Sequence, residues 1–156
     1  MEAASPPTPL NFIGPKQIIS AIDSNKVLDL EGASYIKGAG LQIFQNNKTL
    51  NQKFFIEKVG YSEYIIRVAH SNLVLGIDGG KVDIKESQLL NRRVVQLPQN
   101  NDNNQKWIFE DARNGYFFIR STLGWYLDVA DGDMTNGNTI NIHQFNGSKA
   151  QQFKIK

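Results

Sequence analysis

Two aspartates in this chain stand at the same distance from a downstream glutamine. Asp29 lies 23 residues before Gln52, and Asp128 lies 23 residues before Gln151. An ionised carboxylate accepts hydrogen bonds from two donors at once, and a neighbouring amide can donate or accept. The shared spacing therefore indicates one polar arrangement used twice, suited to binding a ligand by hydrogen bonds.

The residues between these ends also correspond. Gln42 and Asn141 each lie 13 residues after the aspartate, and Phe44 and His143 each lie 15 residues after it. An amide and a flat ring thus follow each carboxylate at fixed positions. A leucine-aspartate pair on a strand is usually only a strand with a surface charge, but the repeated spacing favours a functional role.

A third copy lies in the middle of the chain and departs from this pattern. Gly76 stands where the aspartate is expected and precedes Gln105 by 29 residues, about six more than in the other copies. The ring position falls on Leu97 or Pro98, depending on where the extra residues are placed. We therefore expect no binding site in this copy.

The composition argues against catalysis and against a metal or cofactor site. The chain has two histidines and no cysteine, which excludes cysteine nucleophiles and Cys-ligated zinc. Asp131-Gly132-Asp133 resembles the start of a calcium loop, but the later ligand positions do not fit. Asp29 and Asp128 fall in different repeats, whereas a glycosidase pair needs carboxyls within roughly 10 Å. We expect no enzyme activity and no cofactor.

Three anchor motifs set the organisation of the chain. NQKF at 51–54, NQKW at 104–107 and AQQF at 150–153 each follow a polar loop and begin an apolar run. Short runs rich in Ile, Val, Phe and Tyr recur between turn residues, which predicts an all-β chain of about a dozen strands. We expect the anchor glutamines to tie loops to strands, and the aromatic residues Phe54, Trp107 and Phe153 to be core.

The repeats divide the chain into one domain of three lobes. We place the domain at residues 16–156, with lobes at about 16–60, 61–113 and 114–156. Residues 1–15 contain several prolines and are predicted to form an extended or disordered tail.

Charge and hydropathy limit the classes of partner and the location. The formal net charge is +2 and no long basic run occurs, so we expect no nucleic-acid binding. No apolar run approaches the roughly 18 residues of a membrane span, and the first residues do not resemble a signal peptide. We expect no membrane insertion, and a cytoplasmic location or secretion without a signal peptide. The sequence leaves open whether the chain is a monomer or a homodimer.

The triple Gln-x-Phe/Trp anchor with leucine-aspartate strands resembles the ricin B-type lectin family. This resemblance runs from about Lys16 to Lys156 and implies a β-trefoil of three pseudo-symmetric four-strand lobes with sugar sites on the lobes. It implies a complete first-lobe site at Asp29, Gln42, Phe44, Asn51 and Gln52. It implies a third-lobe site at Asp128, Asn141, His143 and Gln151, where Ala150 replaces the asparagine.

The resemblance also implies the function. Glycans of glycoproteins or glycolipids are the expected partners, with galactose or N-acetylgalactosamine as the sugar and two unequal sites that crosslink them. Because Ala150 lacks a hydrogen-bonding side chain, we expect the third lobe to bind more weakly. The alternative is a β-trefoil protease inhibitor or protein-interaction module that retains the sugar-site residues as relics.

Overall fold

The chain is all-β, as the sequence predicts. The computed structural model describes residues 12–79 and 91–156, which form 12 strands and five short 3-10 helices. The first lobe contains β1 (Ile18–Ser20), β2 (Lys26–Leu30), η1 (Glu31–Ala33), β3 (Leu41–Gln45), η2 (Leu50–Gln52) and β4 (Phe54–Gly60). The second contains β5 (Glu63–Val68), β6 (Val74–Ile77), β7 (Val94–Leu97), η4 (Asn103–Gln105) and β8 (Trp107–Asp111). The third contains β9 (Tyr116–Ser121), β10 (Tyr126–Val129), η5 (Ala130–Gly132), β11 (Ile140–His143), η6 (Lys149–Gln151) and β12 (Phe153–Ile155).

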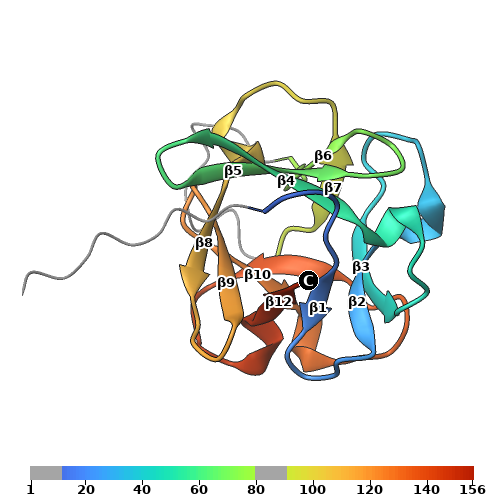
Figure 1. Cartoon of the computed structure of the whole chain (residues 1–156), viewed down its shortest axis with the longest axis vertical. Coiled ribbons are helices and arrows are strands. Elements are labelled where there is room, and N and C mark those ends of the chain that lie inside the picture. Colours follow the sequence, from blue (N-terminus) through green and yellow to red (C-terminus); the bar gives the residue numbers. More distant parts are fainter. Residues whose placement is uncertain (1–11, 80–90) are drawn as a thin grey trace, which may run out of the picture.

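Two strands from each lobe form a closed barrel. Antiparallel pairing runs from β4 to β5, β8, β9, β12 and β1, and a bridge between Lys16 and Phe54 closes the ring. The C-terminus lies beside β1, as Figure 1 shows. Closing the barrel removes the free edges at which open sheets pair with other chains.

The other two strands of each lobe form a hairpin, and the three hairpins meet. β2 pairs with β3, β6 with β7, and β10 with β11. Single bridges join them in a triangle: Gly40 to Val95, Arg93 to Asn141, and Gln42 to Thr139. A six-stranded barrel with three joined hairpins is a β-trefoil, which confirms the predicted fold class.

The three anchor motifs bury their aromatic residues in one core. Phe54, Trp107 and Phe153 are fully buried, and they belong to a single hydrophobic cluster to which all three lobes contribute residues. The prediction that these residues form the core is confirmed. Because each lobe has only four short strands, the core is shared among the lobes.

The anchor glutamines tie loop backbone together in every lobe. Gln52 accepts from the backbone N–H of Asn47 at 2.8 Å, and its Nε2 donates to the carbonyl of Gln45 at 2.9 Å. Gln105 makes the same two kinds of bond in the second lobe and Gln151 makes them in the third. A structural role is therefore confirmed, although the backbone partners of Gln105 and Gln151 lie in loops and only Gln52 also reaches the backbone of a strand. The middle lobe keeps this role although it lacks the aspartate.

The domain begins before the predicted boundary at Lys16. Phe12 falls in the segment predicted as a tail, yet its ring packs 5.2 Å from that of Phe109 and 6.0 Å from those of Tyr64 and Phe117. The sequence does not predict this contact, because a single aromatic residue in a proline-rich segment gives no periodic signal. The rest of the predicted tail, residues 1–11, lies outside the described residues.

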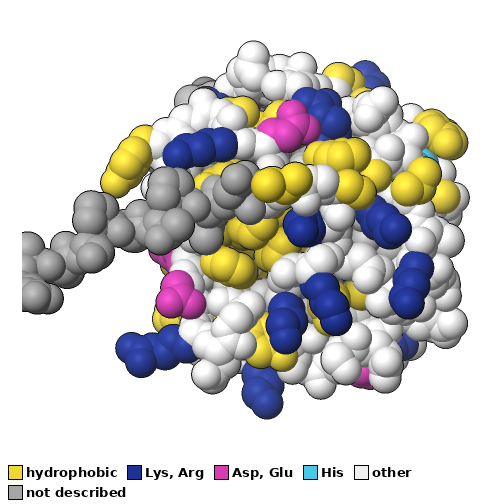
Figure 2. Space-filling view, viewed as in Figure 1, with side chains coloured by type: hydrophobic (Ala, Val, Ile, Leu, Met, Phe, Trp, Pro, Cys, Tyr) yellow, Lys and Arg dark blue, Asp and Glu magenta, His cyan; other side chains and the backbone are white. Residues whose placement is uncertain are grey.

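Charges are dispersed on the face seen in Figure 2. Lys and Arg side chains are spread over this face, and one of them lies beside an acidic side chain. Within residues 12–79 and 91–156, no helix has the length and apolarity needed to cross a membrane.

Candidate functional site

Cross-strand register brings the predicted polar residues together in the first and third lobes. Asp29 on β2 lies opposite Gln42 on β3, and Asp128 on β10 lies opposite Asn141 on β11. Directly paired residues project from the same face of a hairpin with their Cβ atoms about 5 Å apart. Each carboxylate therefore has its predicted amide as a neighbour.

The predicted ring residues lie one pair further along the same hairpins. Phe44 pairs with Val27 in the first lobe, and His143 pairs with Tyr126 in the third. Side chains two residues apart on a strand share a face, so each ring stands beside its amide. Both side chains are partly exposed.

The middle hairpin has the same register but no polar group at these positions. Gly76 pairs with Val95, and Leu97 pairs with Val74. Leu97 therefore occupies the ring position, and Val95 replaces the amide. A Cβ atom added at Gly76 would lie 2.9 Å from Leu97 Cδ1 and 3.1 Å from Gln105 Cγ. Apolar atoms fill the volume in which the other lobes place a carboxylate.

The first-lobe carboxylate is bound by two amides of its own lobe. Gln52 donates from Nε2 to Oδ2 of Asp29 at 2.8 Å, and Gln42 donates from Nε2 to Oδ1 at 3.1 Å. Asp29 is 4% exposed. Burial raises its pKa, and the hydrogen bonds from Gln52 and Gln42 oppose that rise.

The predicted asparagine of the first lobe makes a bond to the main chain. Asn51 donates from Nδ2 to the carbonyl of Leu30 at 3.0 Å and accepts from Thr49 Oγ1 at 2.6 Å. In the middle lobe, Asn104 donates to the corresponding carbonyl of Ile77 at 3.4 Å. Because a lobe without a carboxylate keeps this bond, the bond belongs to the fold as well as to any site.

The third-lobe carboxylate has fewer internal partners. Gln151 donates from Nε2 to Oδ2 of Asp128 at 2.9 Å. Asn141 is one methylene shorter than its counterpart Gln42, and its Oδ1 is buried without a hydrogen-bond partner among the described residues. Burial raises the pKa of Asp128, against the hydrogen bond from Gln151 and the charge of His143. A carboxylate and an amide oxygen are thus left with capacity to accept.

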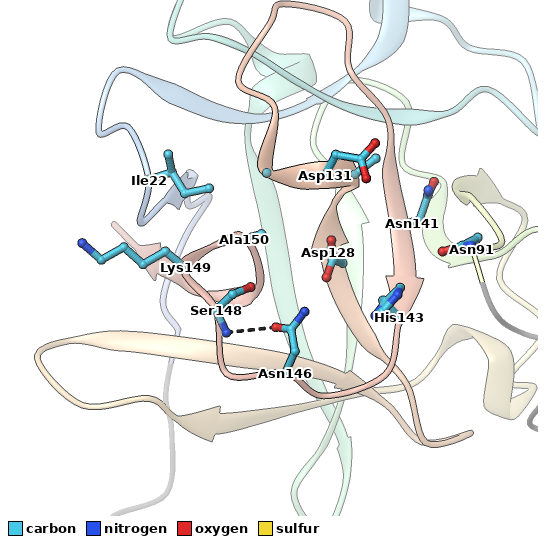
Figure 3. Close-up of a pocket in the computed structure, with 12 residues that line it drawn as sticks. Ile22, Asn91, Asp128, Asp131, Asn141, His143, Asn146, Ser148, Lys149 and Ala150 are labelled. Atoms are coloured by element: carbon cyan, nitrogen blue, oxygen red, sulfur yellow. Dashed lines mark hydrogen bonds between the residues drawn. The ribbon is translucent and has the colours of Figure 1, made fainter.

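These acceptors line a pocket of about 630 Å³, which we call the third-lobe pocket. It is lined by Ile22, Asn91, Asp128, Ala130, Asp131, Gly132, Asn141, His143, Asn146, Ser148, Lys149 and Ala150. Figure 3 shows Asp128 between the strand that carries Asn141 and His143 and the turn that carries Ala150. The Lys149 side chain extends away from Asp128 in this view.

Ala150 contributes to the opening beside Asp128. It stands where the other lobes have Asn51 and Asn104, whose amides donate to a main-chain carbonyl. The methyl group of Ala150 leaves that volume free, and Ala150 lines the pocket. The substitution that weakens the family pattern in the sequence therefore coincides with a pocket in the structure.

Two of the nine predicted site residues are completely buried. Gln52 and Gln151 are both 0% exposed and lie behind the carboxylates that they bind. Each glutamine binds one oxygen of its carboxylate. The second oxygen lies on the side of the hairpin neighbour. We interpret them as positioning residues.

Some pocket residues could not be found by aligning the lobes. Ile22 comes from the first lobe and Asn91 from the second, although the pocket centres on the third. Spacing within one lobe carries no information on which residues of a neighbouring lobe lie beside it. Asp131, with φ of 56°, lines the pocket from η5. The sequence suggests this residue only as the start of a calcium loop that does not fit, although its position directly after the aspartate strand is a local signal.

The Asp131 to Asn136 segment forms a hydrogen-bonded turn. Asp133 Oδ1 accepts from the backbone N–H of Thr135 at 2.9 Å and from its hydroxyl at 2.6 Å. These two bonds lower the pKa of Asp133. The aspartate is thus used to close the turn.

His70, which matched no template position, lies near the first-lobe residues. Its Nε2 is 2.8 Å from the carbonyl oxygen of Ser34, and its ring packs 4.8 Å from that of Tyr35. Its charge favours ionisation of Asp29, although less than the amide hydrogen bonds do. The histidine falls in a turn, as expected, and holds the loop after η1.

Comparison with known proteins supports the same architecture. The family model described as ricin-type beta-trefoil lectin domain-like matches residues 14–89 and 103–156. No curated protein sequence matches the chain. The designed three-fold symmetric protein ThreeFoil is 22% identical with a TM-score of 0.83, over 90% of this chain and 96% of that one.

Two natural lectins have similar structures. The ricin B-like lectin of Macrolepiota procera, solved in complex with lactose, is 20% identical with a TM-score of 0.76 and covers 96% of this chain and 99% of its own. The C-half of the earthworm R-type lectin, solved in complex with GalNAc, is 20% identical with a TM-score of 0.66, over 91% of this chain and 97% of its own.

Proposed function

Because the chain belongs to the ricin-type β-trefoil lectin domain-like family, we propose that it binds carbohydrate, principally in the third-lobe pocket. Family membership supports carbohydrate binding in general, without catalysis. The pocket and its residues are our assignment.

The observation that carries the proposal is the open pocket beside Asp128 and Asn141, both of which have unused capacity to accept hydrogen bonds. Asp128 is fixed by Gln151, and Asn141 presents a buried Oδ1 that accepts no hydrogen bond among the described residues. One hydroxyl of a sugar would donate to the second oxygen of Asp128, and rotation of the Asn141 side chain would bring its amide to an adjacent hydroxyl. A hydrogen bond to an ionised group contributes about 1.5–3 kcal/mol, so this pair would contribute much of the affinity of a monosaccharide.

We assign galactose or N-acetylgalactosamine as the sugar class. The M. procera lectin was solved with lactose and the earthworm lectin with GalNAc, and both share the fold of this chain. His143 presents a partly exposed ring beside Asn141, which suits the apolar face of a pyranose.

We assign the first-lobe residues to a second, weaker site. There Asp29 already accepts from both Gln42 and Gln52, and Asn51 donates to the main chain. A sugar would have to share these groups or displace the Gln42 bond. This order is the reverse of the one that the missing asparagine at Ala150 suggests from sequence.

Amide NMR titration with galactose, N-acetylgalactosamine and glucose tests the proposal. The first two sugars should shift the signals of Asp128, Asn141 and His143, and Asp128→Asn should abolish those shifts. Asp111→Asn, at an exposed carboxylate on β8, is the control for charge removal and should leave the shifts unchanged. If no sugar shifts any third-lobe signal, the proposed site is wrong.

A further inference from the structure

Three aromatic rings form an exposed group at one end of the β10–β11 hairpin. Phe145 packs 5.0 Å from Phe118 and 5.2 Å from Tyr126, and the rings of Phe118 and Tyr126 are 6.2 Å apart. We call these three residues the aromatic cluster. Phe145 is 57% exposed, an unusual exposure for a phenylalanine that already has two ring partners.

The aromatic cluster lies on the same hairpin face as the third-lobe pocket. Tyr126 pairs with His143, and Asp128 pairs with Asn141 two residues along each strand. Alternation places all four side chains on one face. Phe145 follows in the loop between His143 and Asn146, both of which line the pocket. The three aromatic residues do not line the pocket themselves, but Tyr126 and Phe145 adjoin its lining residues His143 and Asn146.

A hydrogen bond ties one member of the cluster, Tyr126, to strand β8. The Tyr126 hydroxyl donates to Glu110 Oε1 at 2.6 Å, and Arg120 Nε donates to Glu110 Oε2 at 3.3 Å. Burial, together with the hydrogen bond and charge of Glu110, raises the pKa of Tyr126 to about 12, so the hydroxyl remains a donor over the physiological range. The ring of Tyr126 thus has a fixed orientation beneath Phe145.

The first lobe offers no equivalent surface. Val27 occupies the position of Tyr126 and is fully buried, and Asn46 occupies that of Phe145. The Asn46 side chain accepts from Gln17 Nε2 at 2.6 Å. The aromatic extension is therefore specific to the third lobe.

We infer that the aromatic cluster is a subsite for the second sugar residue of a glycan whose terminal residue occupies the third-lobe pocket. This inference rests on the proposed function of that pocket. Pyranose rings carry an apolar C–H face, and burying such a face against an exposed ring gains the hydrophobic contribution of the area covered. The third lobe would consequently prefer a disaccharide to a monosaccharide, whereas the first lobe would bind both alike.

Isothermal titration with methyl β-galactoside and lactose, combined with amide NMR, tests this inference. In the wild type, lactose should bind the third lobe about three- to tenfold more tightly than methyl β-galactoside, and it should shift the signals of Phe145 and Phe118. Phe145→Ala should remove this difference and leave the affinity for methyl β-galactoside unchanged. Phe55→Ala, at another exposed phenylalanine on β4, is the matched control and should keep the difference.

The outcomes separate the subsite from the pocket. Equal affinities in the wild type, or an equal loss for both sugars in Phe145→Ala, would overturn the subsite while the pocket stands. Failure of both sugars to shift Asp128 would overturn the pocket and the subsite together. If Phe145→Ala instead lowers the sedimentation coefficient of the sugar-free protein, the cluster is a contact between copies of this chain and the subsite is wrong.

Discussion

Gln151 donates a 2.9 Å hydrogen bond to Asp128 while its other contacts hold the loop backbone at Asn146 and Gln144. The same amide thus serves the fold and orients the carboxylate. Gln52 does both for Asp29, whereas Gln105 holds only its loop. This difference lets the two roles be measured separately.

Both Gln151→Ala and Gln105→Ala should destabilise the protein, and Gln151→Ala should do so more because it also removes the bond to the buried Asp128 carboxylate. Each leaves a loop N–H and a carbonyl without partners, which costs about 1–3 kcal/mol of unfolding free energy. Urea denaturation measures this loss. Only Gln151→Ala should also weaken galactose binding, because only that glutamine positions a carboxylate. Equal sugar binding by the two variants would show that orientation of Asp128 is unimportant.

Ala150→Asn should stabilise the third lobe. The new amide would donate to the carbonyl of Val129, as Asn51 donates to that of Leu30, and a net hydrogen bond contributes about 0.5–1.5 kcal/mol. Chemical denaturation is the measurement. Ala150→Leu adds volume without a hydrogen-bond donor and should not raise the free energy of unfolding. If it does, the gain in Ala150→Asn comes from packing and not from the hydrogen bond.

The raised pKa of Asp128 predicts how stability depends on pH. A carboxyl whose folded pKa exceeds its unfolded value stabilises the fold below the unfolded pKa, near 3.8, and that contribution is lost as pH rises through the folded pKa. Asp128→Asn keeps the shape but cannot ionise. The variant should therefore gain unfolding free energy relative to the wild type as pH rises from about 4 to 7, measured by denaturation at each pH.

Sugar affinity should rise as pH rises, whereas the contribution of Asp128 to stability falls. This rise would identify the ionised form of Asp128 as the binding form. As pH falls through the raised pKa of Asp128, the carboxylate gains a proton and loses capacity to accept from hydroxyls, so galactose should bind more weakly. His143→Gln removes the imidazole from the pocket and is the control. A pH dependence of affinity that disappears in His143→Gln would assign the effect to the histidine.

The sequence predicts the fold well because the β-trefoil repeats its determinants three times. Each anchor aromatic is buried and each anchor glutamine makes equivalent loop bonds. The pairings of Asp29 with Gln42 and of Asp128 with Asn141 also follow from equal spacing, since spacing within a hairpin fixes register.

Spacing in the sequence does not predict which of the two sites binds sugar more tightly. Whether a side chain faces a ligand or the main chain depends on its length and on its neighbours in three dimensions. Asn51 donates its amide to the carbonyl of Leu30, and Asn141 makes no hydrogen bond to Asp128, whereas Gln42 donates to Asp29. Asn91 and Ile22 reach the pocket from other lobes, which no spacing within one lobe reveals.

Gly76→Ala should destabilise the middle lobe. Its Cβ would lie 2.9 Å from Leu97 Cδ1 and 3.1 Å from Gln105 Cγ, and overpacking of this kind costs about 1–3 kcal/mol. Combining it with Leu97→Ala should recover part of the loss, so the two effects on unfolding free energy should not add. Additive effects would locate the strain elsewhere, for example at the Asn104 carbonyl 3.3 Å away.

Agglutination of red cells should require both proposed sites. A monomer bridges two cells only when it binds glycans twice, so Asp29→Ala and Asp128→Ala should each abolish the titre. Asp128→Ala should remove the larger part of monosaccharide binding. Sedimentation velocity checks the oligomeric state, and a strictly monomeric single-site variant that still agglutinates would disprove the two-site assignment.

The pairing of the first strand with the last has a consequence for how the chain folds. Ile18 pairs with Ile155, so the barrel closes only when residues from opposite ends of the domain meet. Contacts so distant in sequence carry a large loop-closure entropy and slow the search for the native topology. During synthesis, the first two lobes emerge before β12 exists, and their core residues have no final strand to cover them. Completion of the barrel must therefore wait until the residues of β12 have emerged from the ribosome.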